Sequence, residues 1–115
     1  MKQSLIYIEH ILDCIQKIKK YTSNSSKEDF LNSPIMQDAV IRNLEVIGEA
    51  TKKIDKSFRE RHADIEWKKI AGMRDKLIHD YIGVDIWAVW NVVDKILPDF
   101  EMEIKAIIEK ESNHK

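Results

Sequence analysis

The sequence predicts an all-α protein, folded as an up-and-down bundle of four to five helices. Apolar residues recur at steps of three and four along most of the chain, which is the helical period. Only three Gly and two Pro occur in 115 residues, so few turns interrupt the helices. No stretch keeps the alternating pattern of a strand. We therefore expect helices packed on one another around one core.

Length and composition indicate a single domain over residues 1–115. A chain of 115 residues is too short for a second core of useful size. Hydrophobic residues make up 43% and charged residues 34%, as in an ordered globular protein. The 19 Lys and Arg against 20 Asp and Glu give a net charge of −1, so no global positive field attracts a polyanion. Any contact with nucleic acid must therefore be local.

Cysteine usage and hydropathy favour the cytoplasm. Cys14 is alone, which excludes an internal disulfide and a multi-cysteine zinc site and fits a reducing compartment. Polar residues interrupt the apolar stretch from Leu5 to Ile18 at every turn, so it is neither a signal peptide nor a membrane span of about 20 residues. We expect a cytoplasmic protein that does not contact a membrane.

The first two helices follow from apolar stripes and a cap. One stripe consists of Leu5, Ile8, Leu12 and Ile15, and a second of Ile11, Cys14 and Ile18. The first helix therefore contacts two neighbours, and it ends near Tyr21. After a polar segment, Ser33 supplies a cap and Pro34 the first residue of the second helix. The helical period of this second helix fades around Ser57.

The third helix is predicted between two end signals. Residues 58–63 form a connection with room for a turn of helix, capped by Ser57 together with Glu60. Asp64 then caps a helix that runs from about Ile65 towards Tyr81. Gly83 closes it, because a glycine suits the position that follows a helix.

Asp85 opens the fourth helix, whose apolar face is wide. That face comprises Trp87, Val89, Trp90, Val93, Ile96 and Leu97. Pro98 either kinks this helix or starts a fifth. The spacing of Trp87 and Trp90 is more typical of core or dimer packing than of a platform that stacks nucleic-acid bases.

Arg74 is an anomaly at the centre of the apolar face of the third helix. At about 100° per residue, apolar residues flank it on both sides, and they are Trp67, Ile70, Ala71, Met73, Leu77, Ile78 and Tyr81. A charge there is costly unless it is paired, reaches a cleft or lies at an interface. One explanation is an ion pair with Glu45 or Glu49 of the second helix, and the other is a contact with a second subunit.

His79 lies near the end of the same helix, where an imidazole can cap carbonyl groups. It is five residues from Arg74, about 140° around the helix, so the two need not converge within one chain. In a two-fold dimer whose third helices meet, two arginines and two histidines border one cleft. Lys68, Lys69 and Lys76 either add positive potential for RNA there or form an ordinary solvated face.

The segment from Trp67 to Tyr81, WKKIAGMRDKLIHDY, resembles the signature of the HEPN superfamily in the branch of the HepT-like toxins. That signature is an arginine, a polar residue, a short spacer, a histidine, one residue and a tyrosine. Residues 47–50, 84–90 and 97–98 continue the likeness, so it covers most of the chain. The family usually has asparagine at the position of Asp75, and a carboxylate repels phosphate where an amide does not.

The resemblance implies a HEPN-like fold, a homodimer and metal-independent endoribonuclease activity in a cleft shared by both subunits. Arg74 would hold phosphate, His79 would transfer protons and Asp75 would support them. The resemblance further implies a type VII-like toxin–antitoxin pair with a minimal nucleotidyltransferase as antitoxin. This partner would transfer AMP from ATP to Tyr81, while the chain itself would need no cofactor and no metal.

The chemistry of these residue types suits RNA cleavage. Histidine, with an ordinary pKa of about 6.5, serves as base or acid near neutral pH, and the guanidinium fork holds two phosphate oxygens. Cleavage by the RNA 2′-hydroxyl leaves a 2′,3′-cyclic phosphate and a 5′-hydroxyl. Tyr81 lies two turns from Arg74 on the same face, so an AMP there would bring a phosphate towards the arginine. Otherwise Tyr81 is a partly buried aromatic residue.

Two other functions stay open from the sequence. The chain could be a non-enzymatic subunit that presents substrate to a minimal nucleotidyltransferase or restrains it, or a plain helical dimerisation module. Metal sites have less support. His10 and Cys14 share a helical spacing without a second pair for zinc, and Glu45 and Glu49 lack the histidines of carboxylate-bridged metal bundles.

Overall fold

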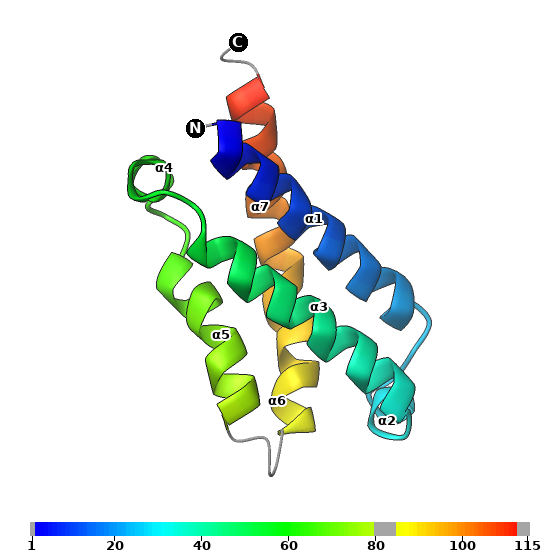
Figure 1. Cartoon of the computed structure of the whole chain (residues 1–115). Helices are drawn as coiled ribbons and strands as arrows, with labels where there is room; N and C mark the ends of the chain where they lie inside the picture. The colour runs from blue at the N-terminus through cyan, green and yellow to red at the C-terminus, as the bar shows by residue number, and fades with distance from the viewer. Residues whose placement is uncertain (1, 80–84, 113–115) are drawn as a thin grey trace.

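The computed structural model describes residues 2–79 and 85–112, except the side chains of residues 2, 74 and 76–79. Within these residues, four longer helices run up and down (Figure 1), and they are α1 (Lys2–Thr22), α3 (Pro34–Lys52), α5 (Trp67–His79) and α7 (Leu97–Ser112). Short helices α2 (Lys27–Leu31), α4 (Lys56–Arg61) and α6 (Ile86–Asn91) join them, and the π-helical segment η2 (Val92–Ile96) links α6 to α7. The described residues include no strand, so the predicted all-α bundle is confirmed.

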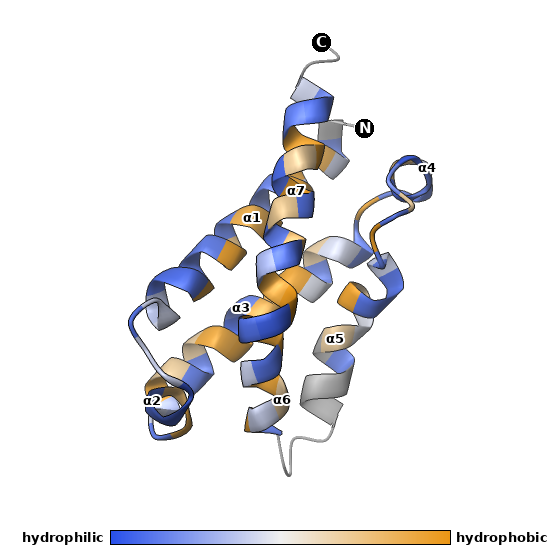
Figure 2. Cartoon of the chain, turned by 180° about the vertical axis from the view of Figure 1, so that it is seen from behind, coloured by the Kyte–Doolittle hydropathy of each residue, from blue (hydrophilic) through white to orange (hydrophobic). Residues whose placement is uncertain are grey.

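The core lies between the long helices. Its fully buried side chains include Ile8, Ile11, Ile15, Ile18, Leu44, Ile47 and Ile104. Helix α1 packs on both α3 and α7, as its two apolar stripes predict. Figure 2 shows apolar and polar residues alternating along α1 and α3, as expected for helices with one face in the core.

The predicted start of the second long helix is confirmed, but its end is not. The hydroxyl of Ser33 accepts a hydrogen bond from the Met36 amide at 3.2 Å, and Pro34 is the first residue of α3. The helix stops at Lys52, and α4 begins with Asp55 rather than Ser57 as its cap. The Asp55 carboxylate accepts hydrogen bonds from the Phe58 amide and from the Ser57 hydroxyl, both at 2.9 Å. Ser57 therefore supports this cap and is not the cap itself.

The third long helix begins later than predicted, because Asp64 does not cap it. Helix α5 starts at Trp67, whose backbone amide donates to the Ile65 carbonyl at 2.9 Å. The Trp67 indole N–H donates to the carbonyl of His62 at 3.0 Å. These two bonds hold the preceding turn outside the helix. The predicted closing residue, Gly83, lies outside the described residues, as does Tyr81.

The fourth helix begins as predicted, with the Asp85 carboxylate accepting a hydrogen bond from the Ala88 amide at 3.2 Å. The π-helical turn η2 directly precedes α7, in which Pro98 is the second residue. Proline has no amide proton and its ring crowds the carbonyl four residues earlier, and a wider turn relieves both constraints. The chain thus continues through Pro98 into α7. Among the described helices, none is long and apolar enough to cross a membrane.

Candidate functional site

Helix α5 carries both Arg74 and His79 on one continuous stretch of helical backbone. In an α-helix, a separation of five residues corresponds to a rise of about 7.5 Å and a turn of about 140°. Buried Trp67 and Ile70 anchor the first turns of α5, which packs mainly on α3. The side chains of Arg74, Lys76 and His79 lie outside the description, so their predicted roles stay predictions.

Asp75 is half-buried and lies beside the last turn of α3. Its carboxylate is 3.5 Å from the ammonium group of Lys52, which also lies 3.9 Å from Glu49. The ammonium group partly offsets the negative charge that Asp75 places next to position 74. Sequence reasoning missed Lys52, because Lys52 and Asp75 lie on different helices and no local pattern connects them.

Lys68 and Lys69 are exposed at the start of α5, where they face α4 across a depression of about 500 Å³. Lys56 and Arg59 of α4 line the same depression. The Arg59 guanidinium donates to the carbonyls of residues 51 and 52 at 2.9 and 3.2 Å, so it caps the end of α3. The structure thus adds two cations of α4 to the lysines that the sequence singles out.

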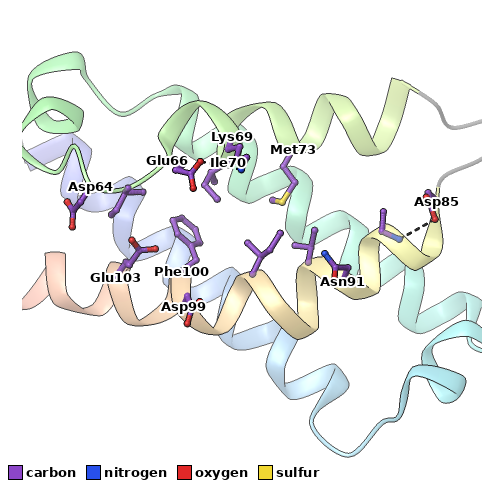
Figure 3. Close-up of a pocket in the computed structure, with 14 residues that line it drawn as sticks. Asp64, Glu66, Lys69, Ile70, Met73, Asp85, Asn91, Asp99, Phe100 and Glu103 are labelled. Atoms are coloured by element: carbon purple, nitrogen blue, oxygen red, sulfur yellow. Dashed lines mark hydrogen bonds and ion pairs between the residues drawn. The ribbon is translucent and has the colours of Figure 1, made fainter.

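The other flank of α5 faces η2 and α7 across a larger groove of about 730 Å³ (Figure 3). Among the described residues, five carboxylates line this groove, those of Asp64, Glu66, Asp85, Asp99 and Glu103. Burial and the nearby charges of Asp64, Asp99 and Glu66 raise the pKa of Glu103. These carboxylates give the described lining of the groove a negative potential, which repels phosphate.

Buried His62 is a titratable group that the sequence analysis did not single out. Its Nε2 atom lies 3.4 Å from a carboxylate oxygen of Glu111, and its ring packs on Phe58 with centroids 4.8 Å apart. Glu111 also accepts a hydrogen bond from Arg61 at 2.9 Å. This cluster ties α4 to the end of α7, so we assign it a role in folding.

The two tryptophans of α6 differ in exposure. Trp90 is half-buried and packs on Phe30 with ring centroids 5.3 Å apart, as predicted for a core residue. Trp87 is 58% exposed, with the Lys27 ammonium group 3.9 Å from its ring centroid, so it does not belong to the core of this subunit.

The candidate metal pairs do not form sites in the described structure. Cys14 is buried, and burial raises the pKa of its thiol, whereas His10 is exposed on the same helix. Among the described residues, no group of three or more His, Cys, Asp or Glu side chains is arranged to hold a metal ion.

Comparison with known proteins finds a family and relatives whose names refer to ribonucleases. The model of the family described as "Ribonuclease HepT-like" matches residues 11–107. A protein of Caldanaerobacter subterraneus subsp. tengcongensis, named "Putative RNase TTE0752", is 44% identical over 96% of this chain and 99% of its own length. "Probable ribonuclease HepT" of Thermococcus cleftensis is 44% identical over 83% of this chain and 86% of its own length. No solved structure matches the chain.

A third relative carries a related segment inside a longer chain. The protein of Methanocaldococcus jannaschii named "Gamma-glutamylcyclotransferase and putative RNase MJ0434" is 45% identical over 99% of this chain but only 51% of its own length.

The all-α bundle and its motif helix define a domain of the HEPN class, as the resemblance of residues 67–81 indicates. The family match over residues 11–107 is more specific: the chain belongs to the HepT-like ribonuclease family.

Proposed function

We propose that this protein is a metal-independent endoribonuclease toxin of a type VII-like toxin–antitoxin pair and acts as a homodimer. The observation that carries the proposal is the position of Arg74 and His79 on one continuous helix in a chain that belongs to a ribonuclease family. Relatives with RNase in their names align with nearly the whole chain, which supports the same activity here.

In the proposed reaction, the RNA supplies its own nucleophile. A neutral His79 accepts the proton of the 2′-hydroxyl, whose oxygen attacks the adjacent phosphorus. The bond from phosphorus to the 5′-oxygen breaks, and this oxygen takes a proton from an imidazolium. Two motif helices in one cleft provide one histidine as base and one as acid. The products are a 2′,3′-cyclic phosphate and a 5′-hydroxyl, with no net change in protons on the protein.

Arg74 stabilises the negative charge that builds on the phosphate oxygens. Its guanidinium fork donates two parallel hydrogen bonds, and a well-placed donor of this kind contributes about 10²-fold or more in rate. Asp75 supports this position, and the Lys52 ammonium group beside it limits the repulsion between the carboxylate and RNA.

RNA follows the basic flank of α5 in this proposal. Exposed Lys68 and Lys69 share a depression with Lys56 of α4, and Lys76 lies further along the helix. Lys69 is 3.3 Å from Glu66 and Lys56 is 3.9 Å from Glu60, so Lys68 is the least compensated of the three described lysines that line the depression. Phosphate groups bound there lead the strand towards the catalytic end of α5.

The activity is controlled by a partner protein, a minimal nucleotidyltransferase that transfers AMP from ATP to Tyr81. The added phosphate would occupy the anion site of Arg74 and exclude RNA. Mass spectrometry of the protein after incubation with this partner and ATP tests the step. We expect the mass of AMP on Tyr81, and none on a Tyr81→Phe variant. AMP on a different residue would contradict the assignment.

The nuclease activity is tested by incubating the purified protein with RNA in EDTA. We expect cleavage with cyclic-phosphate ends, and its loss in His79→Ala with an unchanged circular dichroism spectrum. His10→Ala is the matched control, because His10 is exposed on α1 and has no role in the reaction. Intact RNA with folded wild-type protein would instead favour a non-enzymatic subunit of the nucleotidyltransferase.

A further inference from the structure

The groove between α5 and the α6–α7 arm combines an apolar floor with an acidic rim. Its floor contains the buried side chains of Ile65, Ile70, Val92 and Phe100, with half-buried Met73 and exposed Ile96. Figure 3 shows the labelled Phe100 and Met73 pointing into the space between the two arms. The cavity volume is about 730 Å³, which accommodates several side chains of a partner. Ile96 is 41% exposed, so part of this apolar surface faces solvent.

The rim of the groove carries an excess of negative charge. Among the residues whose side chains are described, five carboxylates line the groove together with one cationic side chain, that of Lys69, which lies 3.3 Å from Glu66. Asp64, Asp99 and Glu103 form no ion pair with any described residue. Burial raises the pKa of Glu103, and the charges of Asp64, Asp99 and Glu66 raise it further.

We propose that this groove docks a cationic amphipathic helix of a second protein. Apolar side chains of that helix would cover Ile96 and Phe100, while its Lys and Arg residues would pair with the rim. The complementary charges would relieve the mutual repulsion of the carboxylates and fix the register of the helix. This inference goes beyond ribonuclease activity and does not depend on it.

Two other occupants fit the groove less well. RNA phosphates would be repelled by Asp64, Glu66 and Glu103 at one end of the groove. A second copy that placed the same groove against itself across a two-fold axis would bring like charges together, which is unfavourable at an interface.

A designed peptide probes the groove directly. The probe is a fluorescein-labelled helix of about four turns made of Leu and Lys, with all Leu on one face. Its binding is measured by fluorescence anisotropy at low salt. We expect at least about tenfold weaker binding of a Ser/Lys peptide of equal charge, because it lacks apolar contacts. A Leu/Glu peptide should not bind, because its charge is repelled by the rim.

Variants of the protein locate the binding surface. Asp64→Asn combined with Glu103→Gln should weaken binding of the Leu/Lys peptide by about tenfold, and Ile96→Ser should do the same. The matched control is Glu9→Gln with Asp13→Asn, which removes two exposed carboxylates of α1 that do not line the groove and should leave binding unchanged. Circular dichroism and the Tm establish that each variant folds.

Three results would overturn the inference. Equal losses in the groove and control variants would mean nonspecific attraction to an acidic protein. Competition by a short single-stranded RNA would assign the groove to nucleic acid. Conversion of an oligomer into monomers by Ile96→Asp, measured by sedimentation equilibrium, would assign it to a second copy of this chain. Each result is obtained without an activity assay, so a failure here is distinct from a failure of the nuclease proposal.

Discussion

The ammonium group of Lys52, in the last turn of α3, lies 3.5 Å from the carboxylate of Asp75 on α5. Asp75 directly follows Arg74, so this ion pair reduces the negative charge beside the proposed phosphate site. The contact joins α3 to α5. It does so at Asp75, where the chain departs from the usual family motif. It therefore links the packing of α3 on α5 to the charge of the candidate site.

Removal of this ion pair should affect catalysis more than stability. Because both side chains are more than 40% exposed, Lys52→Met should lower the free energy of unfolding by less than about 1 kcal/mol. The same change should reduce kcat/KM for RNA, since the Asp75 carboxylate is then less compensated. Asp75→Asn in the Lys52→Met background should restore the rate. An equal rate in Lys52→Met and wild type would contradict this role.

The Trp67 indole should be a main anchor of α5. Trp67→Phe removes the hydrogen bond to the His62 carbonyl and should lower the free energy of unfolding by about 1 kcal/mol. Trp67→Ala also leaves a cavity in the core and should lower it by about 3–5 kcal/mol. Urea denaturation measures both values. If the two variants were equally stable, the indole would not anchor the helix by packing.

Stability should fall in acid because of the Asp55 cap. The amide of Phe58 and the hydroxyl of Ser57 donate to its carboxylate and lower its pKa. The folded state therefore binds this proton less readily than the unfolded state, so the contribution is present above a pH of about 4 and is lost as the pH falls through the lowered pKa.

Variants at Asp55 test this pH dependence through the Tm between pH 6 and pH 3. Asp55→Ala should lower the Tm at pH 6, whereas Asn keeps a capping oxygen and Asp55→Asn should lower it less. In both variants, the Tm should fall less between pH 6 and pH 3 than it does in wild type. If the Tm of Asp55→Asn fell with pH as steeply as that of wild type, other carboxylates would control acid unfolding.

Glu103 should have the opposite effect on pH dependence. Burial and three neighbouring carboxylates raise its pKa, so the folded state binds this proton more readily than the unfolded state. Its ionisation therefore destabilises the fold at neutral pH, and the penalty disappears as the pH falls below the ordinary pKa of about 4.3. Glu103→Gln should raise the Tm at pH 7 and converge on wild type in acid. A lower Tm at pH 7 would contradict this expectation.

The basic flank of α5 should contribute to RNA affinity through phosphate contacts. Lys68→Ala should weaken binding of a single-stranded RNA and reduce the slope of log K against log salt by about 0.7, as expected for the loss of one phosphate contact. Lys17→Ala, on α1, is the matched control and should leave the slope unchanged. Equal slopes in wild type, Lys68→Ala and Lys17→Ala would mean that RNA binds to a different surface of the protein.

Local signals in the sequence account for most of the fold. The apolar stripes of α1, the cap at Ser33 and the cap at Asp85 are each encoded within a few residues, and all three are confirmed. The start of α5 was missed, because Asp64 has the chemistry of a cap while the bond from Trp67 to His62 keeps the intervening turn outside the helix. Such competition between nearby residues depends on packing, which periodicity does not report.

The candidate site, too, could be predicted from the sequence only in part. The motif from Arg74 to His79 is contiguous and identifies the family, but the environment of α5 comes from distant helices. Lys52 beside Asp75 and Lys56 across from Lys68 carry no signature in the sequence. The carboxylates of the acidic groove are scattered between residues 64 and 103, so only the fold brings them together.

The most direct test of the nuclease account uses an RNA oligonucleotide that the protein cleaves at one defined linkage. A matched oligonucleotide has a single 2′-deoxy sugar on the 5′ side of that linkage, and both are incubated with the protein in EDTA. If the 2′-hydroxyl is the nucleophile, cleavage at that linkage disappears while the all-RNA strand yields a cyclic phosphate. Undiminished cleavage of the deoxy-substituted linkage would contradict the proposed roles of His79 and Arg74.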